Sequence, residues 1–198
     1  MFELLKFEIK GLTQHVQHNG LLADVTNPYA VAMKEITKKK TKTADDLKRL
    51  EDLEWEGGLY LNADRRVVVP GNLIEGAMFE AGKLTKDGQV VRNSVSSPKD
   101  WPLIYQGPKT VDGLKADPNF RLRVIVRNPS TKARVARVRP VFREWALKFE
   151  LLYRPDMLSA KEIADMVTRL GSDIGLSDDR KKMGGRFEVV KAEGPFKP

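Results

Sequence analysis

The stretch between Asp117 and Glu144 limits what this chain can form more than any other segment, because it contains eight basic residues and no acidic one. The chain has 35 Lys and Arg residues against 27 Asp and Glu, so its net charge of +8 is accounted for by this stretch alone. A charge excess concentrated on one element is typical of a surface that binds a polyanion, and arginine suits bidentate phosphate contacts. The alternative is a basic hairpin that only protects a sheet edge. The eight residues are Arg121, Arg123, Arg127, Lys132, Arg134, Arg137, Arg139 and Arg143.

Two alternating segments within this stretch predict the strands of a β-hairpin. Residues 121–127 and 132–138 alternate in polarity, and the segment 128–131, Asn-Pro-Ser-Thr, has the composition of a turn. In the first strand the apolar side chains are expected on one face and the arginines on the other, because side chains alternate along a strand. Three arginines are expected on the solvated face of this hairpin: Arg123, Arg134 and Arg137.

Composition indicates a soluble protein with a substantial core. The chain of 198 residues has the length of one ordinary domain, with 41% hydrophobic and 31% charged residues. It contains no apolar run of about 18 residues, so no membrane partner is expected. Zero cysteines and two histidines leave little scope for a metal site, and neither a metal nor another cofactor is expected. The absence of cysteine also fits a reducing cytoplasm, here that of a bacterial host cell.

Apolar periodicity and capping signals predict an α+β fold. The strongest elements, in order, are a strand at 2–10, a helix at 71–82, strands within 121–153, a helix at 160–170 and a strand at 186–191. This is the β-α-β-β-α-β plan of ferredoxin-like folds, which RNA-recognition motifs share. Ser159 with Glu162 predicts a capping box at the start of helix 160–170, as Thr43 with Asp46 does for a helix in the segment 28–56. Helix 160–170 is expected to end at Gly171.

The remaining segments are predicted as additions to a single RNA-recognition-like domain that covers 1–198. Residues 28–56 form a helical insertion, with Lys38, Lys39 and Lys40 in a basic loop between its two helices. Residues 59–69 are expected to form a small hairpin. Residues 85–118 are expected to be a loop-rich insertion with a short strand at 103–106 and another at 90–91, and 120–140 is the basic hairpin.

A glycine-rich segment, 174–187, lies between the last predicted helix and the last predicted strand. Glycines permit close backbone approach, and a basic glycine loop can hold phosphates. We expect Gly175, Gly184 and Gly185 to meet steric needs there, and Phe187 to enter the core. The candidate ligand-binding residues of this loop are Arg180, Lys181, Lys182, Gly184, Gly185 and Arg186.

The chain resembles the RAMP superfamily of CRISPR systems, and within it the crRNA-backbone subunits and their uncharacterised phage-encoded relatives. The resemblance rests on the motifs around 139–149 and 171–187 and on the helix start at 69–77. It implies a modified RNA-recognition fold whose glycine loop contacts nucleic-acid backbone. Because backbone-type relatives form filaments, it also implies a homo-oligomer or filament. Asp178 and Asp179 put acids inside the loop, which departs from the family pattern and favours the phage-type relative.

Three functions remain open on the sequence. The first is a non-catalytic protein that binds single-stranded DNA or RNA through a basic sheet face or hairpin. If about six of its cations engaged phosphates, log affinity would fall against log salt with a slope of roughly −4. The second is a metal-independent endoribonuclease using His15, beside His18. The third is a structural or assembly protein of a phage particle. The aromatic residues considered for base stacking are Tyr29, Tyr60, Trp101 and Tyr105.

Overall fold

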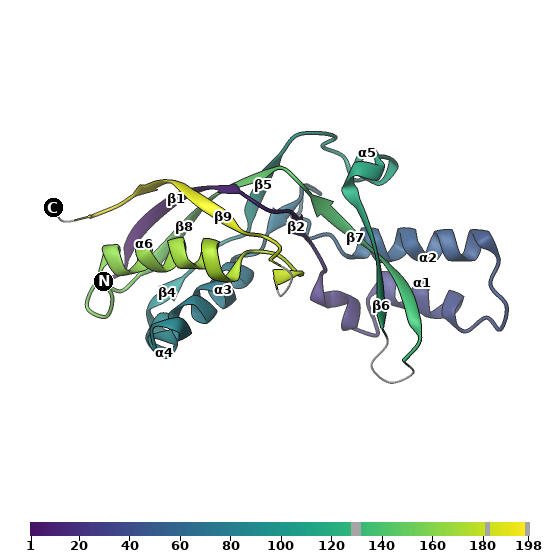
Figure 1. The fold of residues 1–198 in the computed structure, drawn as a ribbon, viewed down its shortest axis with the longest axis horizontal. Coiled ribbons are helices and arrows are strands. Elements are labelled where there is room, and N and C mark those ends of the chain that lie inside the picture. Colours follow the sequence, from purple (N-terminus) through teal and green to yellow (C-terminus); the bar gives the residue numbers. More distant parts are fainter. Residues whose placement is uncertain (128–131, 181–182, 197–198) are drawn as a thin grey trace. The chain divides into compact units, whose positions relative to one another are not determined.

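The computed structural model describes residues 1–127, 132–180 and 183–196, and the chain in it forms two compact units (Figure 1). The first unit comprises residues 1–15, 62–106 and 142–198, and the second comprises 16–61 and 107–141. The second unit therefore combines the predicted helical insertion with the basic hairpin. The assignment of a single domain over 1–198 stays a prediction.

The first unit is built on a mixed-length antiparallel sheet of six strands. The strand order is β3-β5-β8-β1-β9, and β4 pairs with β8. Its centre is β8, in which every second side chain from Trp145 to Tyr153 is buried, as the alternation in the sequence predicts. The strands are β1 (Glu3–Gly11), β3 (Val68–Val69), β4 (Val95–Ser96), β5 (Trp101–Tyr105), β8 (Trp145–Tyr153) and β9 (Phe187–Glu193).

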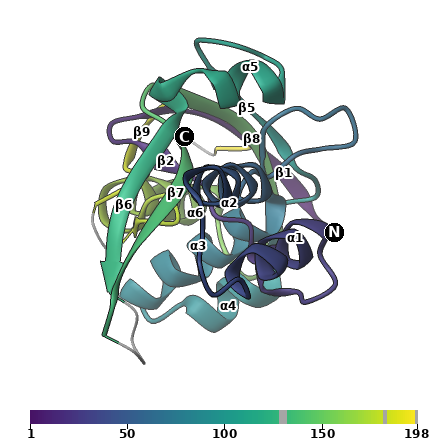
Figure 2. The ribbon, with the colours of Figure 1, turned by 90° about the vertical axis from the view of Figure 1, so that its right-hand side faces the viewer.

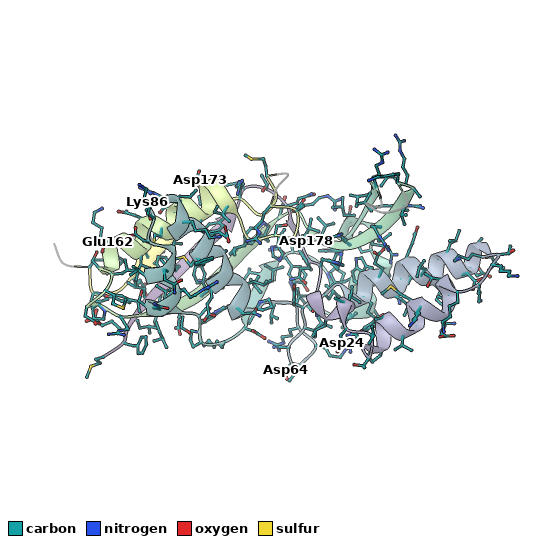
Figure 3. The ribbon with its side chains drawn as sticks, turned by 90° about the horizontal axis from the view of Figure 1, so that it is seen from below. Asp24, Asp64, Lys86, Glu162, Asp173 and Asp178 are labelled. Carbon is teal, nitrogen blue, oxygen red and sulfur yellow. The ribbon has the colours of Figure 1, made fainter. Side chains whose placement is uncertain are left out.

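Helices α3 (Gly71–Leu84), α4 (Gly88–Ser94) and α6 (Ala160–Arg169) lie on one side of this sheet (Figure 1). Of the apolar residues that helical spacing puts on one side of α3, Ile74, Ala77, Met78 and Ala81 are buried, whereas Leu73 is 39% exposed. The predicted capping box of α6 is present, since Ser159 and Glu162 satisfy each other's backbone N–H groups. Glu162 is labelled in Figure 3. The helix does not stop at Gly171, because a π-helical turn, η3 (Leu170–Ile174), continues it.

The second unit contains two antiparallel helices and the hairpin. Strands β6 and β7 pair with each other, and the sheet order is β2-β7-β6. Figure 2 shows β6 and β7 running beside α2. Trp55 of α2 is fully buried, and its indole N–H donates to the Phe120 carbonyl at 2.8 Å, which fixes α2 to the start of β6. The elements are β2 (His15–Val16), η1 (Gly20–Ala23), α1 (Pro28–Thr37), α2 (Ala44–Gly57), α5 (Val111–Ala116), η2 (Pro118–Phe120), β6 (Arg121–Arg127) and β7 (Arg134–Phe142).

Two details of the sequence prediction are wrong. The stretch 85–118 is not loop-rich, since it holds α4, β4, β5 and α5, and residues 90–91 are helical rather than a strand. The neighbour of β8 toward the β3 edge is β5, not a strand of the basic hairpin, which belongs to the three-stranded sheet. The predicted turn within 59–69 is present, since the Asn62 N–H donates to the Arg66 carbonyl at 3.0 Å, and β3 in addition pairs with β5. Elements this short carry too few apolar positions for periodicity to identify them.

Candidate nucleic-acid interface

The register of the basic hairpin fixes which side chains share a face. Arg123 lies opposite Val138, Ile125 opposite Ala136, and Arg127 opposite Arg134, so these pairs form one face. Arg123, Ile125 and Arg127 are exposed, as the alternation of the first strand predicts. Arg137 lies opposite Val124 and therefore shares the other face. The prediction that Arg137 lies with Arg123 and Arg134 on one solvated face is wrong. The composition of a turn does not fix which residues occupy it, so it does not fix the register of the second strand either.

Acidic residues of α2 are the counter-charges of the hairpin. Arg121 pairs with Asp52 at 2.8 Å, Arg123 with Glu51 at 3.0 Å, and Arg137 with Glu54 at 3.2 Å. Glu54 is buried and also accepts the Val138 backbone N–H at 3.0 Å, so it covers an open edge of β7. Sequence reasoning missed these pairs. The signal was present, since residues 51–56, Glu-Asp-Leu-Glu-Trp-Glu, hold four acids and no base.

The distal part of the hairpin has a different environment. Arg127, Lys132 and Arg134 are exposed there. The Arg127 Nε donates to the Lys132 carbonyl at 3.4 Å, and within the described ranges neither Arg127 nor Arg134 forms an ion pair. Ile125, on the same face, is 63% exposed. Accessible cations around an exposed apolar side chain suit a ligand with phosphates and apolar base faces. The predicted turn at 128–131 lies outside the described residues.

The other predicted cations of this region lie in varied surroundings. Arg139 is half-buried, and Arg143, in the first unit, is exposed. In the loop after α1, Lys38 pairs with Glu35 at 2.7 Å and Lys39 with Asp46 at 2.6 Å. Lys40 is exposed. Two of the three loop lysines are therefore already neutralised by carboxylates of α1 and α2.

His18 lies among the charges of the second unit. Burial lowers the pKa of its imidazole, and the nearby Arg139 lowers it further. Its Nδ1 is buried and has no hydrogen-bond partner in the described part of the chain. A neutral imidazole beside Arg139 and Arg137 adds no positive charge to the interface near neutral pH.

The glycine-rich loop of the first unit has the steric requirements that its sequence predicts. Gly175 and Gly185 have φ angles of +84° and +71°, the left-handed region that favours glycine. A Cβ on Gly184 would overlap the Asp179 carboxylate, and one on Gly185 would overlap the Leu176 backbone. Phe187 is buried, as predicted. The loop is fixed to the segment after β1, since the Gly185 N–H donates to the Gln14 carbonyl at 2.7 Å.

Arg186 is the unusual cation of this loop. Its Nε and Nη1 are buried and lack a hydrogen-bond partner among the described residues, while its Nη2 contacts the Met183 sulfur at 3.6 Å. Buried guanidinium nitrogens without an acceptor are rare, since desolvation disfavours them. Arg180 is exposed, as is Asp178, which is labelled in Figure 3. Lys181 and Lys182, also predicted to bind, lie outside the described residues.

His15 is a structural residue of the first unit. It is 3% exposed, its Nδ1 lies 2.5 Å from the Leu176 carbonyl oxygen, and its ring packs against Trp145. A carbonyl only accepts, so the Nδ1 carries the proton. Burial lowers the pKa of His15 to about 4. This geometry leaves the ring no access to a substrate, which speaks against the endoribonuclease hypothesis.

The uncovered face of the six-stranded sheet carries no excess of basic residues. Lys148 pairs with Glu8 at 2.9 Å and Lys6 with Glu150 at 3.7 Å, and a hollow of about 300 Å³ on this face is lined by both signs of charge. Matched charges repel a phosphate as much as they attract it. Of the two surfaces considered from the sequence, the hairpin and not the sheet face has the charge for a polyanion.

The aromatic residues considered for base stacking serve the fold. Trp101 and Tyr105 are buried. The Tyr29 hydroxyl donates to Glu56 at 2.9 Å, and the Tyr60 hydroxyl donates to the His18 carbonyl at 3.1 Å. Tyr29 and Tyr60 are half-buried, so all four aromatic residues are less exposed than Ile125. Among the described residues, no group of three acidic or histidine side chains gathers as a metal site, and no helix reaches the length and apolarity needed to span a bilayer.

Comparison with known proteins identifies the fold. No family model matches the sequence, and no curated sequence matches it. Among solved structures, the chain is similar to a chain in the cryo-EM structure of the Type III-B Cmr-beta bound to cognate target RNA. The TM-score is 0.56 at 11% sequence identity, and the match covers 98% of this chain and 60% of that one. At this identity the likeness shows a shared α/β fold with antiparallel sheets.

Proposed function

We propose that this protein binds single-stranded nucleic acid without cleaving it, and that the distal part of its basic hairpin is the main binding surface. The observation that carries the proposal is the uneven neutralisation of the hairpin. Arg121, Arg123 and Arg137 are paired with α2, whereas Arg127 and Arg134 are exposed without an ion pair in the described ranges. Accessible arginines supply the phosphate contacts on which such binding depends.

The fold supports the same proposal. We take the strand order β5-β8-β1-β9 with helices α3 and α6 as a ferredoxin-like plan, which RNA-recognition motifs share. The similar solved chain comes from an assembly bound to target RNA. Together with the motifs at 139–149 and 171–187, these features support a RAMP-type protein, related to the crRNA-backbone subunits and their phage-encoded relatives. The glycine-rich loop, with the unpartnered nitrogens of Arg186, is proposed as a secondary contact, and assembly along a strand is part of the proposal.

The test is binding of a labelled single strand, RNA and DNA in parallel, to a double charge-reversal variant. Arg127→Glu with Arg134→Glu should lower affinity by about 100-fold or more at low salt, since two attractive contacts become repulsive. Lys161→Glu with Arg169→Glu, two exposed cations of α6, makes the same change in net charge and should have a much smaller effect. Equal losses in the two variants, or none, would refute the hairpin as the binding surface.

The absence of catalysis is tested separately. Stoichiometric protein incubated with labelled RNA and DNA should leave both strands intact. Cleavage would contradict the proposal if it persisted through purification and disappeared in a single-residue variant of this protein. That variant would have to keep the wild-type melting temperature, so that loss of cleavage is not caused by unfolding. The phage structural role is favoured by no feature of the described residues.

A further inference from the structure

Three acids of α2 contact the proximal part of the hairpin, but they are not equivalent. The pair between Arg121 and Asp52 is largely shielded, with side chains 21% and 25% exposed, and Arg121 also lies over the Trp55 ring. Glu54, only 9% exposed in its side chain, pairs with Arg137 and covers the Val138 N–H. These two pairs fasten α2 to the hairpin, and breaking them would damage the fold.

The pair between Arg123 and Glu51 has a different character. The Arg123 side chain is 65% exposed, and the register puts it on the same face as Ile125 and Arg127. Arg123 thus has the exposure and the orientation of the distal cations. It differs from them in having a carboxylate 3.0 Å away. The Glu51 side chain is 27% exposed, but its partner Arg123 is open to solvent, so this pair is screened and contributes less to stability than the two pairs shielded at both ends.

We infer that Glu51 sets the proximal boundary of the nucleic-acid site by keeping Arg123 out of it. A phosphate that approaches Arg123 also approaches the Glu51 carboxylate, and the repulsion offsets the attraction. The strand is therefore confined to the distal part, around Arg127 and Arg134, where the described residues offer no such carboxylate. This inference rests on the proposed function, and it assigns Glu51 as a positioning residue that limits affinity and the length of strand contacted.

The experiment measures the affinity of labelled oligouridylate of about 20 nucleotides, long enough to exceed a single-domain site, at several salt concentrations. Glu51→Gln keeps the size of the side chain and removes its charge. It should raise affinity about fivefold at low salt and steepen the slope of log affinity against log salt by about 0.7, the value for one added phosphate contact on a single strand. The matched control is Glu80→Gln on α3, whose carboxylate pairs with Lys83 at 2.8 Å away from every candidate binding residue, and it should change affinity by less than about twofold.

A double-mutant cycle with Arg123→Ala isolates the mechanism. In wild-type protein Arg123→Ala should have little effect, whereas in Glu51→Gln it should remove the gain in affinity and in slope. The inference is overturned if Glu51→Gln behaves like Glu80→Gln, or if its gain persists without Arg123. In either case the wild-type protein still binds and the proposed function stands. A wild-type protein that fails to bind overturns both, and melting temperatures of all variants verify that the fold is intact.

Discussion

At the scale of single residues, the glycine-rich loop depends on backbone conformations that other residues rarely adopt. Gly185→Ala adds a Cβ at a φ of +71° and forces it against the Leu176 backbone, so it should lower the free energy of unfolding by about 1–3 kcal/mol. Gly76→Ala is the control, because nothing lies within 4 Å of its added Cβ, and in a helix it should raise that free energy by about 0.5–1 kcal/mol. Urea unfolding of both variants measures the difference, and similar shifts for the two would contradict this account of the loop.

His15 should give the protein a measurable pH dependence of stability. Its pKa is about 4 in the folded chain against about 6.5 when unfolded, so between these values the unfolded state binds the additional proton. The contribution of His15 is complete above pH 6.5 and is lost as the pH falls toward 4, by about 3 kcal/mol in total. The comparison is urea unfolding at pH 7 and pH 5. His15→Gln should lose less stability than wild type over that interval, and an equal loss would mean that the ring is protonated in the folded chain.

At the scale of elements, prediction from the sequence succeeded where a segment carries its own signal. The strand at 145–153 alternates fully, and the capping boxes of α2 and α6 begin their helices at the residues that the sequence indicates. The strand β5 could not be recognised in the same way, because it has five residues and is completed by pairing with β8. Charge was likewise predictable only where one segment carried the signal by itself. The basic run was visible, but its pairs with α2 join residues 69 to 83 positions apart in the sequence and depend on tertiary structure.

The two faces of the hairpin should therefore respond differently to the same substitution. Arg137→Ala removes the partner of a buried carboxylate, and it should lower the free energy of unfolding by about 1–3 kcal/mol. Arg134→Ala removes an exposed side chain and should change it by less than about 0.5 kcal/mol. Thermal unfolding of both variants tests this division. If Arg134→Ala proved the more destabilising of the two, the distal cations would have a structural role that these contacts do not explain.

At the scale of the whole molecule, the net charge of +8 overstates the positive charge that is accessible to a nucleic acid. Removing the eight cations of the basic stretch would balance the chain, but three of the eight are already balanced by α2. The second unit thus combines the most basic and a strongly acidic segment of the sequence. The field that guides a polyanion therefore comes from the distal hairpin rather than from the total charge.

The salt dependence of binding distinguishes a site that engages six cations from one that engages only the three distal cations. Six engaged cations would give a slope of roughly −4 for a single strand, whereas the three distal ones, Arg127, Lys132 and Arg134, would give about −2. We expect the smaller value, because phosphates must compete with carboxylates for the proximal arginines. Arg127→Ala should reduce the magnitude of the slope by about 0.7, and Arg121→Ala should leave it unchanged while lowering stability. A wild-type slope near −4 whose magnitude falls equally in both variants would contradict this expectation. It would mean that the hairpin arginines leave the carboxylates of α2 and bind the nucleic-acid strand, so that the ion pairs described here exist only in the unbound protein.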